Sequence, residues 1–217
     1  MKKMLILIAA VAVLAPVAAY ADSSTTNASR DCAALKAKMG ATDFAKAYPT
    51  FGACVSAMTP LERSNATSAQ QLCTAEQNDS NFAASHDGKT FAEVYGSGKN
   101  GKNAFGKCVS LKTQASSQAV QKNQPNPART CVAERTSLGV KAFDAKYGTN
   151  GTAKNAFGKC VSKTAHAQVN AQTSAAKLCL TEQSLSGFES HWGTNANLSN
   201  AFGMCVSSTA KSIQHKS

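Results

Sequence analysis

The eight cysteines are the residues of this 217-residue chain whose number and spacing most clearly indicate chemistry. They are Cys32, Cys54, Cys73, Cys108, Cys131, Cys160, Cys179 and Cys205. An even number of cysteines in a chain that reaches an oxidising compartment is typical of a disulfide framework. Counting alone leaves about a hundred pairings open. The pairing therefore has to be argued from the pattern that surrounds the cysteines.

The beginning of the chain resembles a secretory leader. Two lysines precede an apolar run from Met4 to Leu14, and Ala19-Tyr20-Ala21 fits a leader-peptidase site. The run is shorter than the about 20 residues that span a bilayer. We interpret residues 1–21 as a signal peptide, which predicts a secreted, periplasmic or envelope protein without an integral membrane segment. Removal of the two leader lysines would lower the formal net charge from +11 to +9.

One segment recurs along the chain. The letters KNAFGKCVS occur at 102–110 and 154–162, SNAFGMCVS at 199–207, and a shorter TFGACVS at 50–56. Recurrence at such intervals is typical of arrays of supersecondary units. We define copy one as 30–58, copy two as 59–123, copy three as 126–170 and copy four as 171–210. Residues 22–29 and the tail at 211–217 are expected to be disordered.

Each full copy has the pattern of a helical hairpin. The Ala-, Leu- and Gln-rich stretch around its first cysteine favours a helix. A Phe and a Tyr or Trp four residues later share a helix face, a Gly ends that turn, and an Asn stands at the expected N-cap of a second helix. These residues are Phe91, Tyr95, Gly96 and Asn103; Phe143, Tyr147, Gly148 and Asn155; and Phe188, Trp192, Gly193 and Asn200. The predicted fold is all-α, a tandem array of four disulfide-stapled helical-hairpin repeats.

The simplest pairing joins the two cysteines of each copy. It predicts the disulfides Cys32–Cys54, Cys73–Cys108, Cys131–Cys160 and Cys179–Cys205. The rival pairing joins adjacent copies, for example Cys160 with Cys179. The stretch between these two contains no Gly or Pro and keeps a helical apolar stripe. If copies three and four share that helix, the two cysteines lie about 28 Å apart, whereas a disulfide needs Cα atoms within about 7 Å.

Other local signals concern helix boundaries. The sequence Thr59-Pro60-Leu61-Glu62 is typical of a capping box and predicts a new helix after copy one. Two prolines between Asn123 and Pro127 predict a break between copies two and three. The Gly before each second cysteine recurs in all four copies, which suggests a close backbone approach beside the disulfide. These glycines are Gly52, Gly106, Gly158 and Gly203.

The string from aromatic-Gly-Thr-Asn to NAFGKCVS resembles that of uncharacterised exported bacterial repeat proteins. The resemblance covers copies two to four well and copy one poorly. The resemblance implies an exported repeat protein, and it implies no activity, ligand, cofactor or catalytic residue.

The sequence contains little evidence for a catalytic, metal or cofactor site. No HExxH, CxxC or Cys/His cluster is present, and the four histidines occupy no matching positions in the copies. They are His86, His166, His191 and His215. The polar loops lack the carboxylates that calcium requires. An enzyme would need an asymmetric cleft with a pair of carboxylates or histidines, and the sequence indicates no such pair.

Acidic and basic residues near the disulfides suggest weaker hypotheses. The recurring Glu76, Glu134 and Glu182 are expected to make helix-surface or capping contacts, with a functional polar ladder as the alternative. Lysines gather in copies two and three, at Lys99, Lys102, Lys107, Lys112, Lys154, Lys159 and Lys163. Of these, Lys102, Lys107, Lys154 and Lys159 are the candidate anion-binding residues. Copy four has Ser199 and Met204 instead of two of them, so the residues common to all copies are those that pack.

We interpret the chain as a non-enzymatic exported protein with a binding or structural role at the cell envelope or outside the cell. One alternative is a weak, salt-sensitive polyanion binder that holds nucleic acid or an anionic envelope polymer through copies two and three. A second alternative is a secreted enzyme. The sequence identifies no specific partner. It also predicts that copy three folds alone as an oxidised unit.

Overall fold

The computed structural model describes residues 18–97, 100–149 and 151–215, with side chains from Ser23 onward. Every regular element in these residues is an α-helix, which confirms the all-α class. The helices are α1 (Ala18–Met39), α2 (Ala41–Ala47), α3 (Phe51–Asn78), α4 (Phe82–Ser85), α5 (Phe91–Tyr95), α6 (Ala104–Asn123), α7 (Pro127–Leu138), α8 (Val140–Tyr147), α9 (Ala156–Glu182), α10 (Phe188–Trp192) and α11 (Ala201–His215).

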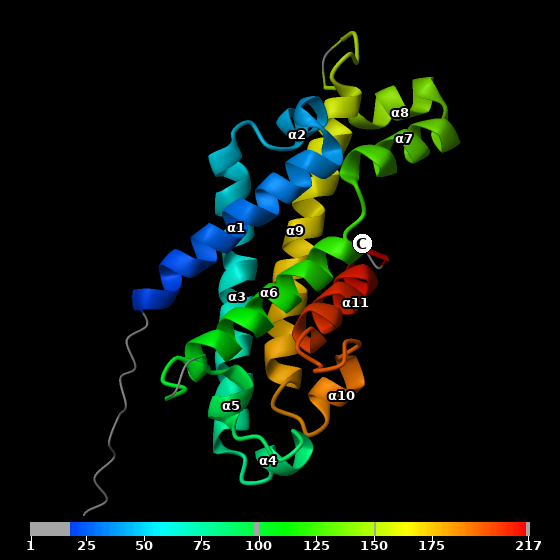
Figure 1. The fold of residues 1–217 in the computed structure, drawn as a ribbon. Coiled ribbons are helices and arrows are strands. Elements are labelled where there is room, and N and C mark those ends of the chain that lie inside the picture. The colour runs from blue at the N-terminus through cyan, green and yellow to red at the C-terminus, as the bar shows by residue number, and fades with distance from the viewer. Residues whose placement is uncertain (1–17, 98–99, 150, 216–217) are drawn as a thin grey trace, which may run out of the picture.

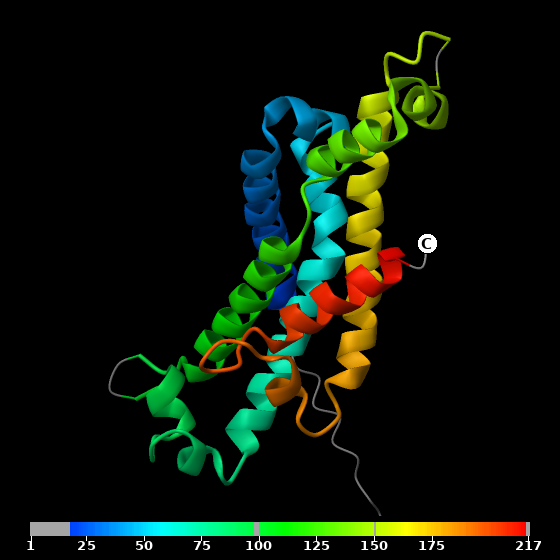
Figure 2. The same ribbon diagram turned by 90° about the vertical axis from the view of Figure 1, so that its right-hand side faces the viewer.

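Two long helices, α3 and α9, lie side by side at the centre of the molecule (Figures 1 and 2). Helices α1 and α6 pack on α3, and α11 packs on both α9 and α6. The hairpin of α7 and α8 packs on α9 at the same end of the molecule as α2. The remaining short helices, α4, α5 and α10, lie at the opposite end.

The disulfides confirm the pairing within copies. They join Cys32 with Cys54, Cys73 with Cys108, Cys131 with Cys160, and Cys179 with Cys205, with Cα atoms 6.0 to 6.1 Å apart. The predicted helix shared by copies three and four is α9, which carries both Cys160 and Cys179. Each central helix therefore holds one cysteine from each of two disulfides.

The predicted helix start at Thr59 is wrong, because α3 continues through Pro60. A proline inside a helix removes one backbone hydrogen bond and costs about 3 kcal/mol. Burial on both sides of the proline offsets this cost, since Met58 and Leu61 both lie in the core. The predicted break does occur: α6 ends at Asn123, and the side chain of Asn126 caps α7 by accepting from the next two free backbone amides.

The expectation of disorder at residues 22–29 is also wrong. These residues belong to α1, where Ser24 and Ala28 are buried and the helix packs against α3. At the other end, α11 continues to His215, so the start of the expected tail is helical as well. Most of the predicted signal peptide, residues 1–17, lies outside the described part of the chain.

The apolar side chains form three clusters that do not follow the order of the copies. The first contains residues of both copy one and copy three, such as Phe44 and Phe143. The second joins copy four to Leu61 of α3 and Val120 of α6. The third contains residues of copy two alone, between Ala69 and Val109. Copy two therefore has a core of its own, whereas copy three shares its core with copy one.

The close backbone approach predicted at the recurring glycine occurs in copy four only. A Cβ at Gly203 would lie 2.3 Å from the carbonyl oxygen of Ser116 on α6, whereas one at Gly106 would meet nothing within 4 Å. The prediction is wrong for the other copies because no backbone lies close there: a Cβ at Gly158 would meet only the Lys46 side chain, at 3.6 Å, and one at Gly52 only the Thr50 side chain, at 3.8 Å. Tight approaches occur instead at the loop glycines, where a Cβ at Gly148 would lie 2.7 Å from the Cβ of Ala153.

Candidate functional site

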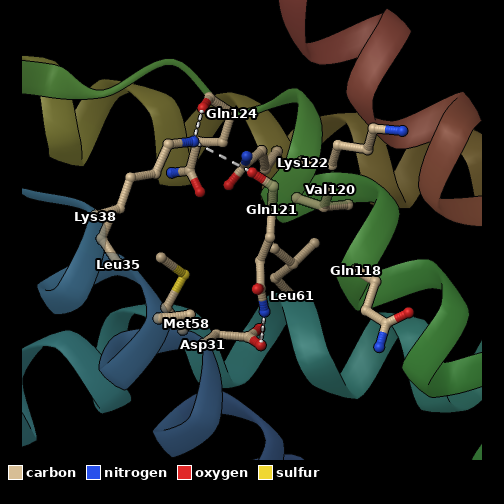
Figure 3. Close-up of a pocket in the computed structure, with 12 residues that line it drawn as sticks. Asp31, Leu35, Lys38, Met58, Leu61, Gln118, Val120, Gln121, Lys122 and Gln124 are labelled. Atoms are coloured by element: carbon tan, nitrogen blue, oxygen red, sulfur yellow. Dashed lines mark hydrogen bonds between the residues drawn. The ribbon is translucent and has the colours of Figure 1, made fainter. Parts of the chain in front are cut away.

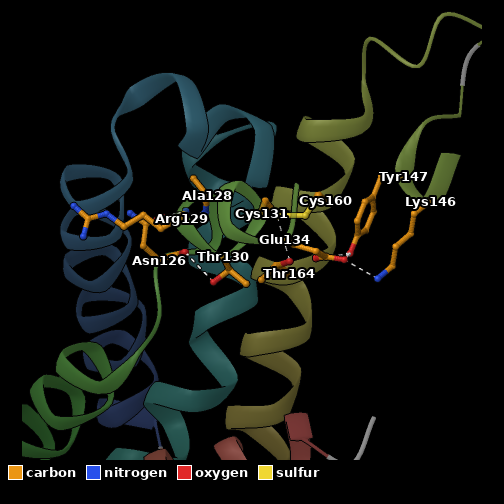
Figure 4. The surroundings of a disulfide bond; sticks show 10 residues. All are labelled: Asn126, Ala128, Arg129, Thr130, Cys131, Glu134, Lys146, Tyr147, Cys160 and Thr164. Carbon is orange, nitrogen blue, oxygen red and sulfur yellow. Dashed lines mark hydrogen bonds and ion pairs between the residues drawn. A yellow bond between two sulfur atoms is a disulfide. The ribbon is translucent and has the colours of Figure 1, made fainter. Parts of the chain in front are cut away.

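The recurring glutamates bind the recurring aromatic residues. The Tyr147 hydroxyl lies 2.9 Å from both carboxylate oxygens of Glu134, beside the Cys131–Cys160 disulfide (Figure 4). Equivalent bonds join Tyr95 to Glu76 at 2.9 Å and Trp192 to Glu182 at 3.1 Å. Burial is the first cause that raises the Tyr147 pKa, and the neighbouring Glu134 carboxylate adds to it. These carboxylates thus orient aromatic side chains within copies two, three and four, and they form no ladder along the molecule.

The recurring asparagines stabilise the loops. Asn155 stands at the predicted N-cap of α9, but its side chain makes no capping bond. It accepts from the backbone amide of Thr149 at 3.2 Å and donates to the Thr149 hydroxyl at 2.7 Å. Asn103 with Ser97 and Asn200 with Thr194 form the same pair of bonds. The recurring polar residues are thus occupied in holding each copy together.

The four candidate anion-binding lysines do not form one surface. All four are exposed. Lys102 and Lys107 lie around the start of α6, beside α5, and Lys154 and Lys159 lie around the start of α9, beside α8. Figures 1 and 2 show these two helix starts at opposite ends of the molecule. Any anion bound by both pairs would have to span its length.

Lys112 is not part of a solvated basic cluster. Its side chain is 1% exposed, and its ammonium lies 2.9 Å from Glu76 and 2.8 Å from Glu189. It therefore joins copy two to α10 of copy four. Lys99, also named in that cluster, lies outside the described residues. Lys163 in copy three lies 5.9 Å from the centroid of the Tyr147 ring.

The histidines are dispersed over the fold. His86 stacks on Phe82, His166 meets the edge of Tyr48, and His191 meets the edge of Trp192. Within the described ranges, no group of three or more His, Cys, Asp or Glu side chains is placed to hold a metal ion. The same ranges contain no helix that is long and apolar enough to cross a bilayer.

A pocket of about 310 Å³ opens between α1, α3 and α6, with α9 contributing one residue (Figure 3). Most of its surface is apolar, although seven of its twelve lining residues have polar side chains. Figure 3 shows Lys38 with Gln124 at one end and Asp31 with Gln121 at the other. The lining residues are Asp31, Ala34, Leu35, Lys38, Met58, Leu61, Gln118, Val120, Gln121, Lys122, Gln124 and Gln172.

Behind this pocket lies a pair of carboxyl groups that the sequence did not reveal. Asp31 on α1 is 7% exposed and lines the pocket, and its hydrogen-bond partner Glu62 on α3 is 0% exposed. Glu62 accepts from Ser117 and from Asn65, each at 2.7 Å, and Gln121 donates to Asp31. The sequence indicated no such pair; the structure brings these two carboxyl groups together, and Asp31 alone of them lines the pocket.

Burial controls the protonation of this pair. Loss of hydration, followed by the charge of Asp31, raises the pKa of Glu62 to about 8. Burial also raises the pKa of Asp31, although hydrogen bonds with Glu62 and Gln121 oppose that rise. Near neutral pH, Glu62 holds the proton and donates it to the Asp31 carboxylate. With Glu62 protonated, Asp31 is the member of the pair that can carry negative charge, and it is the one that lines the pocket.

Two further polar groups of the pocket, on Lys38 and Gln172, differ in their hydrogen bonding. The Lys38 ammonium donates to the backbone carbonyl of Gln124 at 2.5 Å and lies 3.4 Å from that of Gln121, at the end of α6. Positive charge is favourable at the C-terminal end of a helix. By contrast, the buried side-chain oxygen Oε1 of Gln172 has no hydrogen-bond partner in the described part of the chain.

Sequence reasoning missed this site because its residues do not share a motif. Asp31 and Glu62 lie on different helices, and only the packing of α1 on α3 brings them together. Glu62 also occupied the last position of the predicted capping box, which concealed its burial. The signal that could have exposed it was the apolar stripe of α3, since Leu61 and Ala69 flank Glu62 and Asn65 on the buried face.

Comparison of the chain with protein-family models, with curated proteins and with solved structures finds no match.

Proposed function

We propose that this chain is an exported, non-enzymatic binding protein, in which four disulfide-stapled helical-hairpin repeats in tandem provide the scaffold for the pocket between α1, α3 and α6. The observation that carries the proposal is a division of roles. The side chains that recur among the copies bond to one another, whereas the carboxyl pair at the pocket, Asp31 and Glu62, does not recur.

The carboxyl pair illustrates this division. Asp31 directly precedes the first cysteine of copy one, and the other copies have Leu72, Thr130 and Leu178 there. Glu62 lies eight residues after the second cysteine, where the other copies have Ser116, Gln168 and Ile213. A buried charged pair without a cation is costly for folding. Its presence at one place in the scaffold therefore supports a role in function.

The arrangement favours binding over acid–base catalysis. A general acid or base must come within hydrogen-bond reach of the reacting proton. Asp31 satisfies this condition for a molecule in the pocket, but Glu62 is fully covered and is not among the lining residues. The pocket thus offers a single carboxylate with a proton donor behind it, which suits the recognition of a ligand.

Export is supported by the leader-like residues 1–21 and by four disulfides, which persist in oxidising compartments. It predicts that secreted or periplasmic material begins at Asp22. Intact-mass spectrometry of exported protein would check this. A retained Met1, or a start well past Ser29, would contradict it.

The binding role can be tested by fragment screening with NMR on the mature, oxidised chain. We expect fragments to shift the amide signals of α1, α3 and α6 around the pocket. Ala34→Trp should abolish these shifts because it fills the pocket, whereas Ala37→Trp is a matched control on the exposed side of the same helix. Fragments that bind elsewhere, or that bind Ala34→Trp equally well, would contradict the proposal.

The polyanion alternative has one observation in its favour, since its four lysines are exposed and make no ion pair among the described residues. Charge-only binding must weaken steeply with salt. The test is a heparin titration at low and at physiological salt. The variant combines Lys102→Ser, Lys107→Met, Lys154→Ser and Lys159→Met, which are the residues that copy four has at these positions. Equal binding by this variant, or binding that ignores salt, would remove the alternative.

A further inference from the structure

We infer that the pocket takes a small organic cation, in which an ammonium or amidinium group meets Asp31 and an apolar body fills the space beyond it. This inference rests on the proposed function, because it assumes that the pocket binds a ligand, and it specifies the chemical class of that ligand. Three features of the pocket support it.

The first feature is an uncompensated charge. Asp31 is more than nine-tenths buried, and no Lys or Arg of the described residues forms an ion pair with it. Two lysines also line the pocket: the Lys38 ammonium is held by the carbonyls at the end of α6, and the exposed Lys122 points away from Asp31. Figure 3 shows the Lys38 ammonium at the end of the pocket away from Asp31. Burial of an unpaired charge is costly, and a cationic ligand would remove that cost.

The second feature is a second acceptor without a donor. Gln172 on α9 is 5% exposed, lines the same pocket, and its Oε1 has no partner in the described ranges. A buried carbonyl oxygen left without a hydrogen bond costs about 1 to 3 kcal/mol. The Asp31 carboxylate and the Gln172 oxygen are both acceptors, and N–H donors of a ligand would satisfy either of them. An ammonium or amidinium group has such donors, and a carboxylate group has none.

The third feature is the size and character of the remaining lining. The volume of about 310 Å³ is roughly ten times the ~30 Å³ that a water molecule occupies in the liquid. Leu35, Met58 and Leu61 line it with hydrocarbon and thioether surface. A body of about ten non-hydrogen atoms therefore fits, and burial of its apolar surface adds to affinity. A single phenyl ring on a short amine has this size.

Three matched probes test the inference by calorimetry on the mature, oxidised chain near neutral pH. They are 2-phenylethylamine, the neutral 2-phenylethanol and the anionic phenylacetate, which share a ring and differ in charge. We expect the amine to bind at least about ten-fold more tightly than the alcohol, and the acid to bind most weakly. Equal binding of amine and alcohol, or tighter binding of the acid, would overturn the inference without any variant being needed.

Variants then assign the charge preference to its residues. Asp31→Asn should weaken amine binding about ten-fold and leave alcohol binding unchanged, and Gln172→Leu should weaken amine binding about three-fold. Asp79→Asn is the matched control, because Asp79 is an exposed carboxylate at the far end of α3, about 27 Å along the helix from Leu61. Unchanged amine binding by Asp31→Asn would overturn the inference. If none of the three probes binds but fragments still bind in the pocket, the inferred cationic ligand is wrong and the proposed binding function stands. If no fragment binds in the pocket either, the proposed binding function is wrong.

Discussion

The hydroxyl of Tyr147 donates to the carboxylate of Glu134, which follows the disulfide-bonded Cys131 by three residues. Copy one has Leu35 at the position of this glutamate, and its Tyr48 hydroxyl is buried without a partner in the described residues. Burial accordingly raises the pKa of Tyr48 to about 12. The two tyrosines thus stand in equivalent sequence positions with opposite hydrogen-bonding status.

This difference predicts opposite effects of one substitution. Tyr147→Phe removes a hydrogen bond to a carboxylate and should lower the free energy of unfolding by about 1 to 2 kcal/mol. Tyr48→Phe removes a buried hydroxyl that has no partner and should leave stability unchanged or raise it by about 1 kcal/mol. Urea denaturation of both variants checks this. If both variants lost the same free energy of unfolding, the hydrogen bond between Tyr147 and Glu134 would make no particular contribution to stability.

The crossing of α6 and α11 predicts a contrast between two equivalent glycines. Gly203→Ala places a methyl group against the backbone of Ser116 and should cost about 3 kcal/mol or more. Gly106→Ala has open space and should raise stability by about 0.5 to 1 kcal/mol through helix propensity. Thermal unfolding measures both effects. A tolerated Gly203→Ala would mean that the two helices do not approach this closely.

Protonation of Glu62 predicts how stability depends on pH. Its pKa is about 8 in the folded chain and about 4.3 when unfolded, so between these values the folded state holds a proton that the unfolded state has released. The free energy of unfolding should therefore fall as the pH rises from about 5 to about 8. Glu62→Gln, which keeps the donor to Asp31, should remove this contribution. Urea midpoints that are equal for wild type at both ends of this range would contradict it.

The distribution of the cores predicts which copy folds alone. The sequence favoured copy three, but its core includes Phe44 and other residues of copy one, so the isolated segment 126–170 would expose that surface. Copy two packs its own aromatics around the Cys73–Cys108 disulfide. Oxidised 59–123 should therefore be more helical by circular dichroism than oxidised 126–170. The reverse order would contradict this division of the core.

Recurrence made part of the fold predictable. The disulfides and α9 could be predicted because equivalent residues occur in several copies, so each copy supports the interpretation of the others. The continuity of α3 through Pro60 could not be predicted, because it depends on packing against neighbouring helices. A local capping motif contains no information about that packing. The same limit applies to Lys112, whose burial depends on Glu189 from a distant part of the chain.

The candidate site was the least predictable feature for the same reason. Its carboxyl pair has no equivalent in the other copies, and the packing of α1 and α6 on α3 assembles the lining. Glu62 matched a capping motif, and Asp31 lay beside a segment expected to be disordered. A search for functional residues that recur among the copies therefore does not identify this pocket.

The central claim is that recurring residues serve the fold and that the unique pocket residues serve binding. The most direct test is the dissociation constant of 2-phenylethylamine for Tyr95→Phe and Asp31→Asn, measured by calorimetry beside wild type. Tyr95→Phe breaks the bond to Glu76 in copy two, so it should lower stability and leave the dissociation constant unchanged. Asp31→Asn should raise the dissociation constant about ten-fold without loss of stability. An altered constant for Tyr95→Phe, or an unaltered one for Asp31→Asn, would contradict the account.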